Sequence, residues 1–253
     1  MFAEERQEKI SLLINEEGSI KVNELSSIFN VSEATIRRDL QEMEEKKLLK
    51  RTHGGAVKIG ITNFEPSFFD KKDEKNIEKQ SIGRYAAELI NDGDTIILDS
   101  GTTTLEIAKN ITAKNITVVT NSIDIAAEIS NRDGVELIVA GGTLRFNTRS
   151  MVGHLCEGVF KNFRVDKAFI GANGISINQG ITTPNFTEAQ AKKAMMNSAN
   201  KIIIVADSSK FENVCLSVIC KVSSITSIIT SGELPEETIK EYEELGIEIM
   251  VSQ

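Results

Sequence analysis

The feature that most constrains the fold is a series of short apolar runs, rich in β-branched residues, that alternate with helical segments. The runs are TIILD, ITVVT, VELIVA, DKAFIGA, KIIIVAD, SIIT and IEIMV. Helical patterns lie between most of them, for example at 103–110, 122–131 and 235–245. Strands that are apolar on both faces and separated by helices are typical of a parallel sheet covered on both sides. The sequence therefore predicts a larger C-terminal α/β domain with a mostly parallel sheet over residues 76–253.

A smaller unit precedes this domain. Apolar residues at helical spacing predict a helix over 3–17, ended by Gly18, and a second short helix around Leu25 and Phe29. Ser32 is a good N-cap for a third helix that runs to about residue 47.

The segments LLKRT and AVKIG, joined by His53-Gly54-Gly55, predict a hairpin. Three helices and a hairpin within residues 1–60 indicate a winged helix-turn-helix domain. We expect a linker at 61–75, around Pro66, and a polar helix from about 71 to 91.

The third helix carries a candidate DNA-reading face. Ile36, Leu40 and Met43 recur at i, i+4 and i+7 and define its buried stripe. Small residues beside two arginines allow a helix to approach a DNA groove and bond guanine edges or phosphates. The alternative is a solvated helix whose arginines pair with Asp39 and Glu42. The side chains expected to face away from the core are Ala34, Thr35, Arg37, Arg38 and Gln41.

The net charge of −8 argues against a nucleic-acid partner until its distribution is considered. Residues 1–60 have a net charge of −1 and residues 61–253 a net charge of −7. The acidity therefore belongs mostly to the larger domain, and a local basic patch survives beside the third helix. That patch has no acid among its members, which are Lys46, Lys47, Lys50, Arg51 and Lys58.

Several other classes of protein are disfavoured. No apolar run approaches a membrane span, and the N-terminus does not resemble a secretion signal. The three cysteines form no C-x-x-C pair, so we expect a cytoplasmic protein with reduced thiols. With two histidines, His53 and His154, there is no metal constellation and no nucleophilic triad to propose.

Polar and glycine-rich loops follow four of the predicted strands. Ligands of parallel sheets bind at the carboxyl ends of strands, and DSGTTT also begins a helix whose amides can hold an anion. Glycine admits a ligand close to the backbone, while Ser, Thr and Asn offer hydrogen bonds to a sugar. Lys210 is a candidate cation for a phosphate, or alternatively a solvated surface lysine. The loop residues predicted to bind the ligand are Ser100, Gly101, Thr102, Thr103, Asn121, Ser122, Gly141, Gly142, Gly171, Asn173 and Gly174.

Longer stretches resemble a known family. SIFNVSEATIRRDLQEMEEKKLLKRTHGGA resembles the signature of the DeoR-type transcriptional repressors. DGDTIILDSGTTT, VVTNS, VAGG, DKAFIGANGIS, GITTP and VADSSKF match the sensor pattern of that family in order. The resemblance implies a winged reader joined to a sugar-phosphate sensor whose fold is similar to ribose-5-phosphate isomerase. The residues that we expect at the DNA, partly from this resemblance, are Ser32, Thr35, Arg37, Arg38, Gln41, Arg51, His53, Gly54 and Gly55; His53 has the alternative role of shaping the turn.

An isomerase is the alternative function. The isomerases have an Asp-Gly-Ala-Asp pattern where this chain has Ile170-Gly171-Ala172-Asn173, so both acidic positions are absent. Asp99 and Glu188 remain nearby in the pattern and join the effector-binding candidates, which keeps proton chemistry open. Binding without turnover is the expectation: a repressor of a sugar or polyol operon, without cofactor, controlled by a phosphorylated sugar. It would bind double-stranded operator DNA as a homodimer or homotetramer.

Overall fold

A computed structural model describes residues 2–46, 48–52, 54–58, 65 and 67–253. The chain divides into two compact units, residues 1–71 and 72–253. The predicted linker at 61–75 lies partly outside the described residues, and a short helix, α4 (Phe68–Asp73), occupies its second half.

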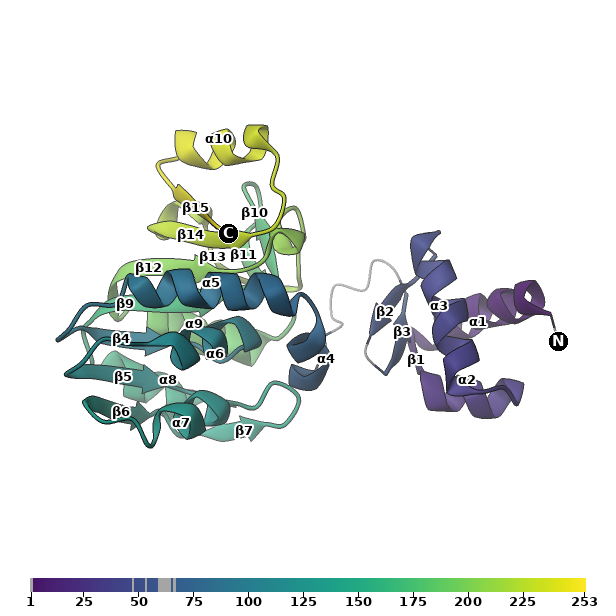
Figure 1. The fold of residues 1–253 in the computed structure, drawn as a ribbon, viewed down its shortest axis with the longest axis horizontal. Helices are drawn as coiled ribbons and strands as arrows, with labels where there is room; N and C mark the ends of the chain where they lie inside the picture. The colour runs from purple at the N-terminus through teal and green to yellow at the C-terminus, as the bar shows by residue number, and fades with distance from the viewer. Residues whose placement is uncertain (1, 47, 53, 59–64, 66) are drawn as a thin grey trace. The chain divides into compact units, whose positions relative to one another are not determined.

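In its described residues, the N-terminal unit forms three helices ahead of α4 and a three-stranded antiparallel sheet of order β1-β3-β2 (Figure 1). Gly18 ends the first helix, as the sequence predicts, with a positive φ of 78°. The hairpin supplies β2 and β3, whereas β1 follows Gly18 directly and was not predicted, because three residues are too short for a recognisable alternation. The elements are α1 (Ala3–Glu17), β1 (Ser19–Lys21), α2 (Val22–Phe29), α3 (Glu33–Glu45), β2 (Lys50–Thr52) and β3 (Gly55–Val57).

The core of this unit confirms the predicted stripe of α3. Ile36, Leu40 and Met43 are at most 1% exposed and pack with residues of α1 and α2. A glycine is needed at position 55, where β3 pairs with β1, because a Cβ there would lie 2.0 Å from the carbonyl oxygen of Ile20. The winged helix-turn-helix is therefore held by an apolar centre and a tightly paired small sheet.

The predicted polar helix over 71–91 is wrong in its extent. The chain forms two helices instead, α4 and α5 (Asn76–Glu88), separated at Lys75, whose φ is +54°. Residues 73–76 are all polar and interrupt the apolar spacing on which a continuous helix would depend.

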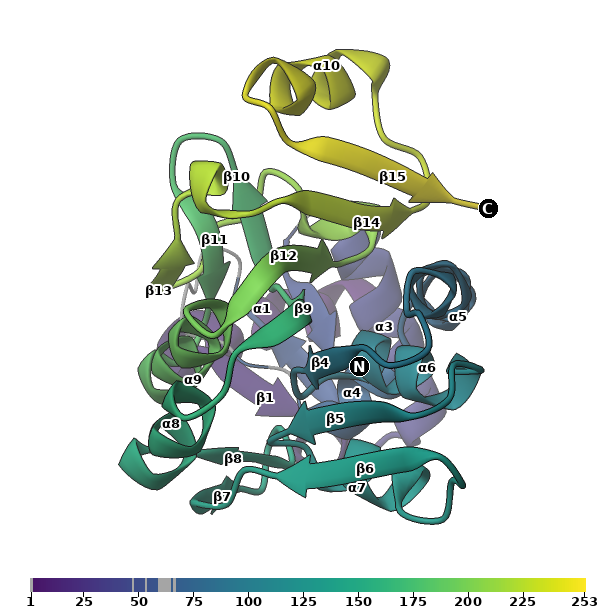
Figure 2. The same ribbon diagram turned by 90° about the vertical axis from the view of Figure 1, so that its left-hand side faces the viewer.

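All seven apolar runs form strands of one sheet in the C-terminal unit, and every neighbouring pair is parallel (Figure 2). The order is β15-β14-β12-β9-β4-β5-β6. This confirms the α/β class and the parallel sheet. The strands are β4 (Thr95–Leu98), β5 (Ile116–Thr120), β6 (Val135–Val139), β9 (Val165–Gly171), β12 (Ala199–Val205), β14 (Ser227–Ser231) and β15 (Glu248–Ser252).

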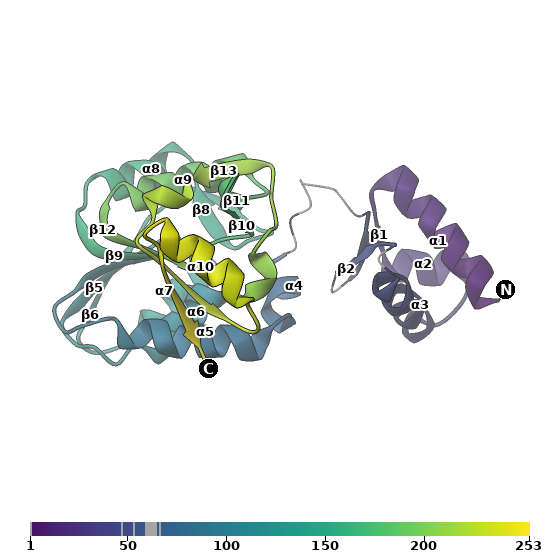
Figure 3. The same ribbon diagram turned by 90° about the horizontal axis from the view of Figure 1, so that it is seen from above.

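Helices cover both faces of this sheet. One face is covered by α5, α6 (Thr102–Asn110) and α7 (Ile123–Ile129), and the other by α8 (His154–Lys161) and α9 (Phe186–Met196) (Figure 3). Two antiparallel additions follow strand ends. One is the hairpin of β7 (Thr143–Arg145) with β8 (Ser150–Val152), and the other is a sheet of β10 (Gly174–Ser176), β11 (Gly180–Thr183) and β13 (Ser217–Cys220). The last helix, α10 (Glu236–Glu244), precedes β15.

The strand order reverses direction at β4. The chain runs from β4 outward through β5 to β6, then returns to place β9 on the other side of β4. In open parallel sheets such a switch point opens a crevice at the carboxyl ends of the two strands, because their connections leave to opposite faces. The fold therefore directs attention to the residues that follow β4 and β9. Within the described part of the chain, no helix is long and apolar enough to cross a bilayer.

Candidate functional site

The exposed face of α3 carries the predicted DNA-reading residues. Ser32 caps the helix, since its hydroxyl oxygen accepts a hydrogen bond from the Thr35 amide at 3.2 Å. The Arg38 side chain is 83% exposed and that of Arg37 is 47% exposed, and Gln41 is exposed as well. These side chains therefore lie on the solvent side of the helix, opposite its buried stripe.

The ion pairs of the two arginines are local. Arg37 lies 3.3 Å from Glu33 and Arg38 lies 3.5 Å from Glu42, each one helical turn away. Of the two acids weighed as partners for these arginines, Glu42 pairs with Arg38. Exposed pairs of this kind contribute about 0–1 kcal/mol, so they hold the guanidinium groups only weakly against a phosphate.

Asp39 instead forms a buried ion pair with Arg6 of α1. The Arg6 Nε lies 2.5 Å from Oδ2, and Nη2 donates to Oδ1 at 3.0 Å. The hydrogen bond to Asp39 raises the pKa of Arg6, although burial opposes that rise. Beside this pair, Gln7 donates to Glu42 at 2.8 Å. These polar contacts fasten α3 to α1, and Glu42 contacts both Gln7 of α1 and Arg38 of its own helix.

The hairpin beside α3 is tied to the same unit through its backbone. The Arg51 amide donates to the Glu44 carboxylate at 2.8 Å, and the Gly54 carbonyl accepts from the Val22 amide at 2.6 Å. Gly54 is exposed at the turn, while Gly55 is buried in the sheet, which gives Gly55 a packing role. His53 lies outside the described residues.

In the C-terminal unit, Asp99 bridges the switch point. It directly follows β4, is 1% exposed, and its Oδ2 accepts a hydrogen bond at 2.9 Å from the amide of Gly171 at the end of β9. Lys192 of α9 forms an ion pair with the same oxygen and donates to the Gly171 carbonyl at 3.1 Å. Burial raises the pKa of Asp99, and Lys192 opposes that rise. Asp99 Oδ1 is buried without a hydrogen-bond donor among the described residues.

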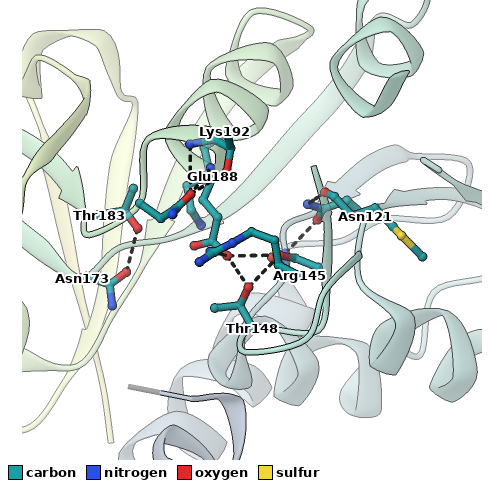
Figure 4. Close-up of polar contacts among 12 residues, drawn as sticks. Asn121, Arg145, Thr148, Asn173, Thr183, Glu188 and Lys192 are labelled. Carbon is teal, nitrogen blue, oxygen red and sulfur yellow. Dashed lines mark hydrogen bonds and ion pairs between the residues drawn. The ribbon is translucent and has the colours of Figure 1, made fainter. Parts of the chain in front are cut away.

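Glu188 lies one turn before Lys192 on α9 and is also buried. Its Oε1 accepts from Arg145 Nη1 at 2.7 Å, from Ser150 Oγ at 3.1 Å and from Thr148 Oγ1 (Figure 4). These three donors belong to β7, β8 and the turn between them. The hairpin is therefore fastened to α9 by one carboxylate oxygen.

Two predicted asparagines make hydrogen bonds from loops that follow the strands neighbouring β4. Asn121, after β5, accepts from the Ser100 amide at 3.2 Å and donates to the Met151 carbonyl at 2.8 Å. Asn173, after β9, accepts from the Thr183 hydroxyl at 3.1 Å (Figure 4). The loops that follow β4 and β5 thus meet the hairpin at one edge of the sheet, whereas the loop after β9 is tied to β11.

The other predicted loop residues divide into two groups. Gly101 is the N-cap of α6, followed by Thr102, which is buried, and Thr103, which is half-buried, and the first turn of this helix contains no acid. Ser122 caps α7 by accepting from the Ile125 amide at 3.3 Å.

Four positions in these loops serve packing or lie apart. Gly142 and Gly174 serve close packing, since a Cβ would lie 2.6 Å from the Val152 oxygen and 2.4 Å from the Asn213 oxygen respectively. Gly141 is exposed. Lys210 follows β12, which β9 separates from β4, and its Nζ lies 3.8 Å from Asp207.

Sequence reasoning missed the groups that complete the site: Arg145, Thr148, Ser150 and Lys192. A signal existed for Lys192, because a spacing of four residues places it on the same face of α9 as Glu188. The segment RFNTRS, from Arg145 to Ser150, reads as an ordinary polar turn, and nothing local connects it to α9. Among the described residues, no group of three His, Cys, Asp or Glu side chains could hold a metal ion.

Comparisons with known proteins cover nearly the whole chain. Residues 6–62 match the DeoR-like helix-turn-helix domain, and residues 74–232 match the DeoR C-terminal sensor domain. The uncharacterised HTH-type transcriptional regulator YulB of Bacillus subtilis is 36% identical over 98% of this chain and 96% of its own length. A putative aga operon transcriptional repressor of Escherichia coli O157:H7 is 35% identical over 98% of this chain and 93% of its own.

Two further matches are informative in different degrees. The HTH-type transcriptional regulator GlpR of Haloferax volcanii is 35% identical over 99% of this chain and 98% of its own length. Among solved structures, ribose 5-phosphate isomerase A of Methanocaldococcus jannaschii covers 55% of each chain, with 16% identity and a TM-score of 0.40. That likeness is too loose to bear on activity.

Proposed function

The chain belongs to the DeoR family of transcriptional regulators, and from that premise we propose that it is a DNA-binding repressor of a sugar or polyol utilisation operon. A phosphorylated sugar bound by the C-terminal unit would control it. Two relatives, a putative aga operon transcriptional repressor and a transcriptional regulator named GlpR, are in keeping with this role. As a protein that binds an operator, it would act in the cytoplasm.

The observation that carries the proposal is the solvent exposure of Arg37 and Arg38 on the third helix of a winged helix-turn-helix unit. The second helix of a helix-turn-helix, here α3, enters the major groove with its N-terminal residues, and those residues include Thr35 and both arginines. Arginine can bond guanine in a bidentate manner or bind phosphate, and Ser32 and Gln41 flank the same surface. The exposed turn at Gly54 and the neighbouring Arg51 would reach the backbone beside that groove.

The sensor would use the crevice at the switch point. Backbone amides and hydroxyls at the start of α6 suit an anion, so the loop Ser100–Thr103 is the proposed contact for the phosphate. Lys210, in the short helix after β12, is the proposed cation for that phosphate, and its Nζ lies 3.8 Å from the carboxylate of Asp207. Asn121 and Asn173 would contribute hydrogen bonds from the adjacent strand ends.

Effector binding controls DNA binding only if it favours one arrangement of the protein over another. One reader makes too few base contacts for strong specificity, so we expect a homodimer or homotetramer on repeated half-sites. The effector would then favour an arrangement of subunits that does not fit those half-sites.

We further propose that the sensor binds its ligand without converting it. An aldose–ketose isomerase needs a carboxylate that can accept a proton from carbon. Asp99 and Glu188 are each neutralised by a cation, Lys192 and Arg145, and the acidic pattern of the isomerases is replaced by Ile170-Gly171-Ala172-Asn173. Isomerisation of pentose or hexose phosphates at enzyme-like rates by the purified chain would contradict this part.

The experiment that tests the whole proposal has two stages. The full chain is used to select duplexes from a random DNA library, and a specific sequence with repeated half-sites is the expected result. A thermal-shift screen of sugar phosphates then identifies ligands, and their effect on the selected complex is measured by gel shift. We expect a sugar phosphate to raise the melting temperature and to change DNA affinity, and Lys210→Ala to reduce both responses. Absence of sequence-selective DNA binding would overturn the proposal.

A further inference from the structure

We propose that four buried charged side chains at the switch point recognise the hydroxyl groups of the effector, while its anionic group binds the neighbouring Ser100–Thr103 loop. This inference rests on the proposed function and names which part of the effector each half of the sensor contacts. We call the four side chains the charge cluster; they are Asp99, Arg145, Glu188 and Lys192, and three of them are labelled in Figure 4.

The charge cluster is organised by one face of α9. Glu188 and Lys192 are one turn apart on this helix, and each reaches a partner of opposite charge from a different element. Glu188 forms an ion pair with Arg145 of the β7–β8 hairpin, and Lys192 forms one with Asp99, which follows β4. The side chains are 1% to 19% exposed, so all four groups are largely withdrawn from water. Their positions are fixed by the fold before any ligand arrives.

The sum of these charges decides what the charge cluster can bind. Two acids and two bases cancel, whereas a phosphate monoester carries a charge of about −1.5 to −2 at neutral pH. A phosphate that took Arg145 would leave Glu188 buried beside a second anion, and one that took Lys192 would do the same to Asp99. Removing one partner of a buried pair is strongly unfavourable. The charge cluster is therefore suited to a neutral, polar part of a ligand.

The donor and acceptor inventory specifies that part further. An ionised carboxylate only accepts hydrogen bonds, and a sugar hydroxyl is a natural donor to it. Asp99 Oδ1 is buried and has no donor among the described residues, although buried acceptors are normally satisfied. The three donors on Glu188 Oε1 hold that carboxylate in one orientation. The carboxylates of Asp99 and Glu188, fixed in this way, can discriminate between sugars by the positions of their hydroxyl groups.

The start of α6, next to the charge cluster, suits the anionic group of the effector better. The first turn of α6 contains no acid, and its residues Thr102 and Thr103 add hydroxyl groups to the helix-start amides. Asp99 precedes Ser100 directly, so the two halves of the site are joined through the same loop. A phosphorylated polyol can thus contact both halves at once: the phosphate at the helix start, and the hydroxyl chain toward α9.

The test compares affinities for ligands with and without hydroxyl groups. Glu188→Gln preserves the shape of the side chain and removes its charge, and isothermal titration calorimetry is run on the full chain. The probes are inorganic phosphate, fructose 1-phosphate, tagatose 6-phosphate and galactitol 1-phosphate. Glu188→Gln should weaken the best sugar-phosphate ligand about 10- to 100-fold, the effect of losing hydrogen bonds to a charged group. Binding of inorganic phosphate should stay at the wild-type affinity.

Two other variants complete the design. Glu128→Gln is the matched control, because Glu128 of α7 pairs with Arg132, which follows that helix, outside the charge cluster; it should bind every probe as the wild type does. Thr148→Val leaves both charges in place and removes one hydroxyl that fixes Glu188, so it should weaken the sugar phosphate less than Glu188→Gln does. This variant keeps the test informative if Glu188→Gln fails to fold.

The outcomes separate the two levels of the argument. If Glu188→Gln weakens inorganic phosphate as much as the sugar phosphate, or strengthens it, the charge cluster holds or blocks the anion and this inference is overturned. If the wild-type chain binds none of the sugar phosphates, the proposed function fails in its sensor part, and this inference fails with it. Selective loss of the hydroxylated ligand supports both.

Discussion

The two units of the chain use charged side chains in opposite ways. On α3 the guanidinium groups stand in solvent, with the Arg38 side chain 83% exposed, and their ion pairs are local and weak. At the switch point Asp99 and Glu188 are buried, and each is held by a cation from another element. A surface for DNA must offer its charge to an external polyanion, whereas a site for a small molecule must fix its polar groups in advance.

One ion pair of the N-terminal unit is buried, like those at the switch point. Arg6 and Asp39 are buried and doubly hydrogen bonded, with side chains 7% and 4% exposed, and they join α1 to α3. The comparison therefore suggests a general division: in both units buried pairs orient elements, and only exposed charges are available to a macromolecular partner. Each of the following predictions would break or sharpen that division.

The largest effect is expected from Lys192→Met. The substitution leaves Asp99 buried without its cation, which typically costs about 3–5 kcal/mol of stability. Chemical denaturation of the full chain, followed by circular dichroism, should show this loss at neutral pH. Lys75→Met is the matched control, because the Lys75 and Glu78 side chains of its ion pair are 49% and 26% exposed, and it should change stability little.

The same variant should acquire a specific pH dependence. Burial raises the pKa of Asp99 and Lys192 opposes that rise, so removal of Lys192 lets the pKa rise further. An acid whose pKa is higher in the folded state favours folding at low pH, and this contribution is lost as pH rises from about 3.9 through the folded-state pKa. The deficit of Lys192→Met should therefore shrink as the pH is lowered toward the ordinary carboxyl pKa. A deficit independent of pH would show that Asp99 is not the group responsible.

The second prediction concerns the buried pair of the other unit. Arg6→Met should destabilise the N-terminal unit by about 3–5 kcal/mol, because it strands Asp39. Hydrogen exchange of the α1 and α3 amides measures this loss in the full chain. Tyrosine fluorescence would not report on the N-terminal unit, because both tyrosines, Tyr85 and Tyr242, lie in the other unit. Adding Asp39→Leu should recover much of the protection, as apolar replacements of buried pairs often do. A double variant as unstable as the single one would contradict the assignment of the loss to an unpaired charge.

The contrast between the units also explains what could be predicted from the sequence. The exposed face of α3 is predictable from this helix alone, because Ile36, Leu40 and Met43 mark the buried side and leave the arginines on the other side. The parallel sheet is predictable for a similar reason, since each apolar run is a local signal. The switch-point loops followed from strand ends alone.

Long-range pairing was not predictable. Asp39 and Arg6 are 33 residues apart, and Asp99 and Lys192 are 93 apart, so no periodicity connects the partners. The contact of Arg145 with Glu188 depends on how a hairpin folds back over the sheet, and that follows from tertiary packing. Two local features were missed because they are short: strand β1, and the break at Lys75 between α4 and α5.

The third prediction tests the exposed charge directly. Arg38→Ala should weaken binding to the selected operator by about 1–3 kcal/mol with little change in stability, because its partner Glu42 is 41% exposed and keeps the hydrogen bond from Gln7. Fluorescence anisotropy of labelled duplexes at several salt concentrations gives the affinity and its salt slope. Lys9→Ala is the control for general charge, since Lys9 is an exposed cation on α1. Equal losses for the two variants would mean that Arg38 adds only net charge, and that α3 does not enter the groove.

The smallest effect is expected at Ser32, where capping and DNA contact can be separated. Ser32→Ala removes the acceptor for the Thr35 amide and should cost about 1 kcal/mol of stability. Ser32→Asp keeps a good N-cap and favours the helix dipole, so stability should return to nearly the wild-type value. The same aspartate would face the phosphates if α3 lies in the groove, so operator affinity should fall below that of Ser32→Ala, most strongly at low salt. Wild-type affinity in Ser32→Asp would place the start of α3 away from the DNA.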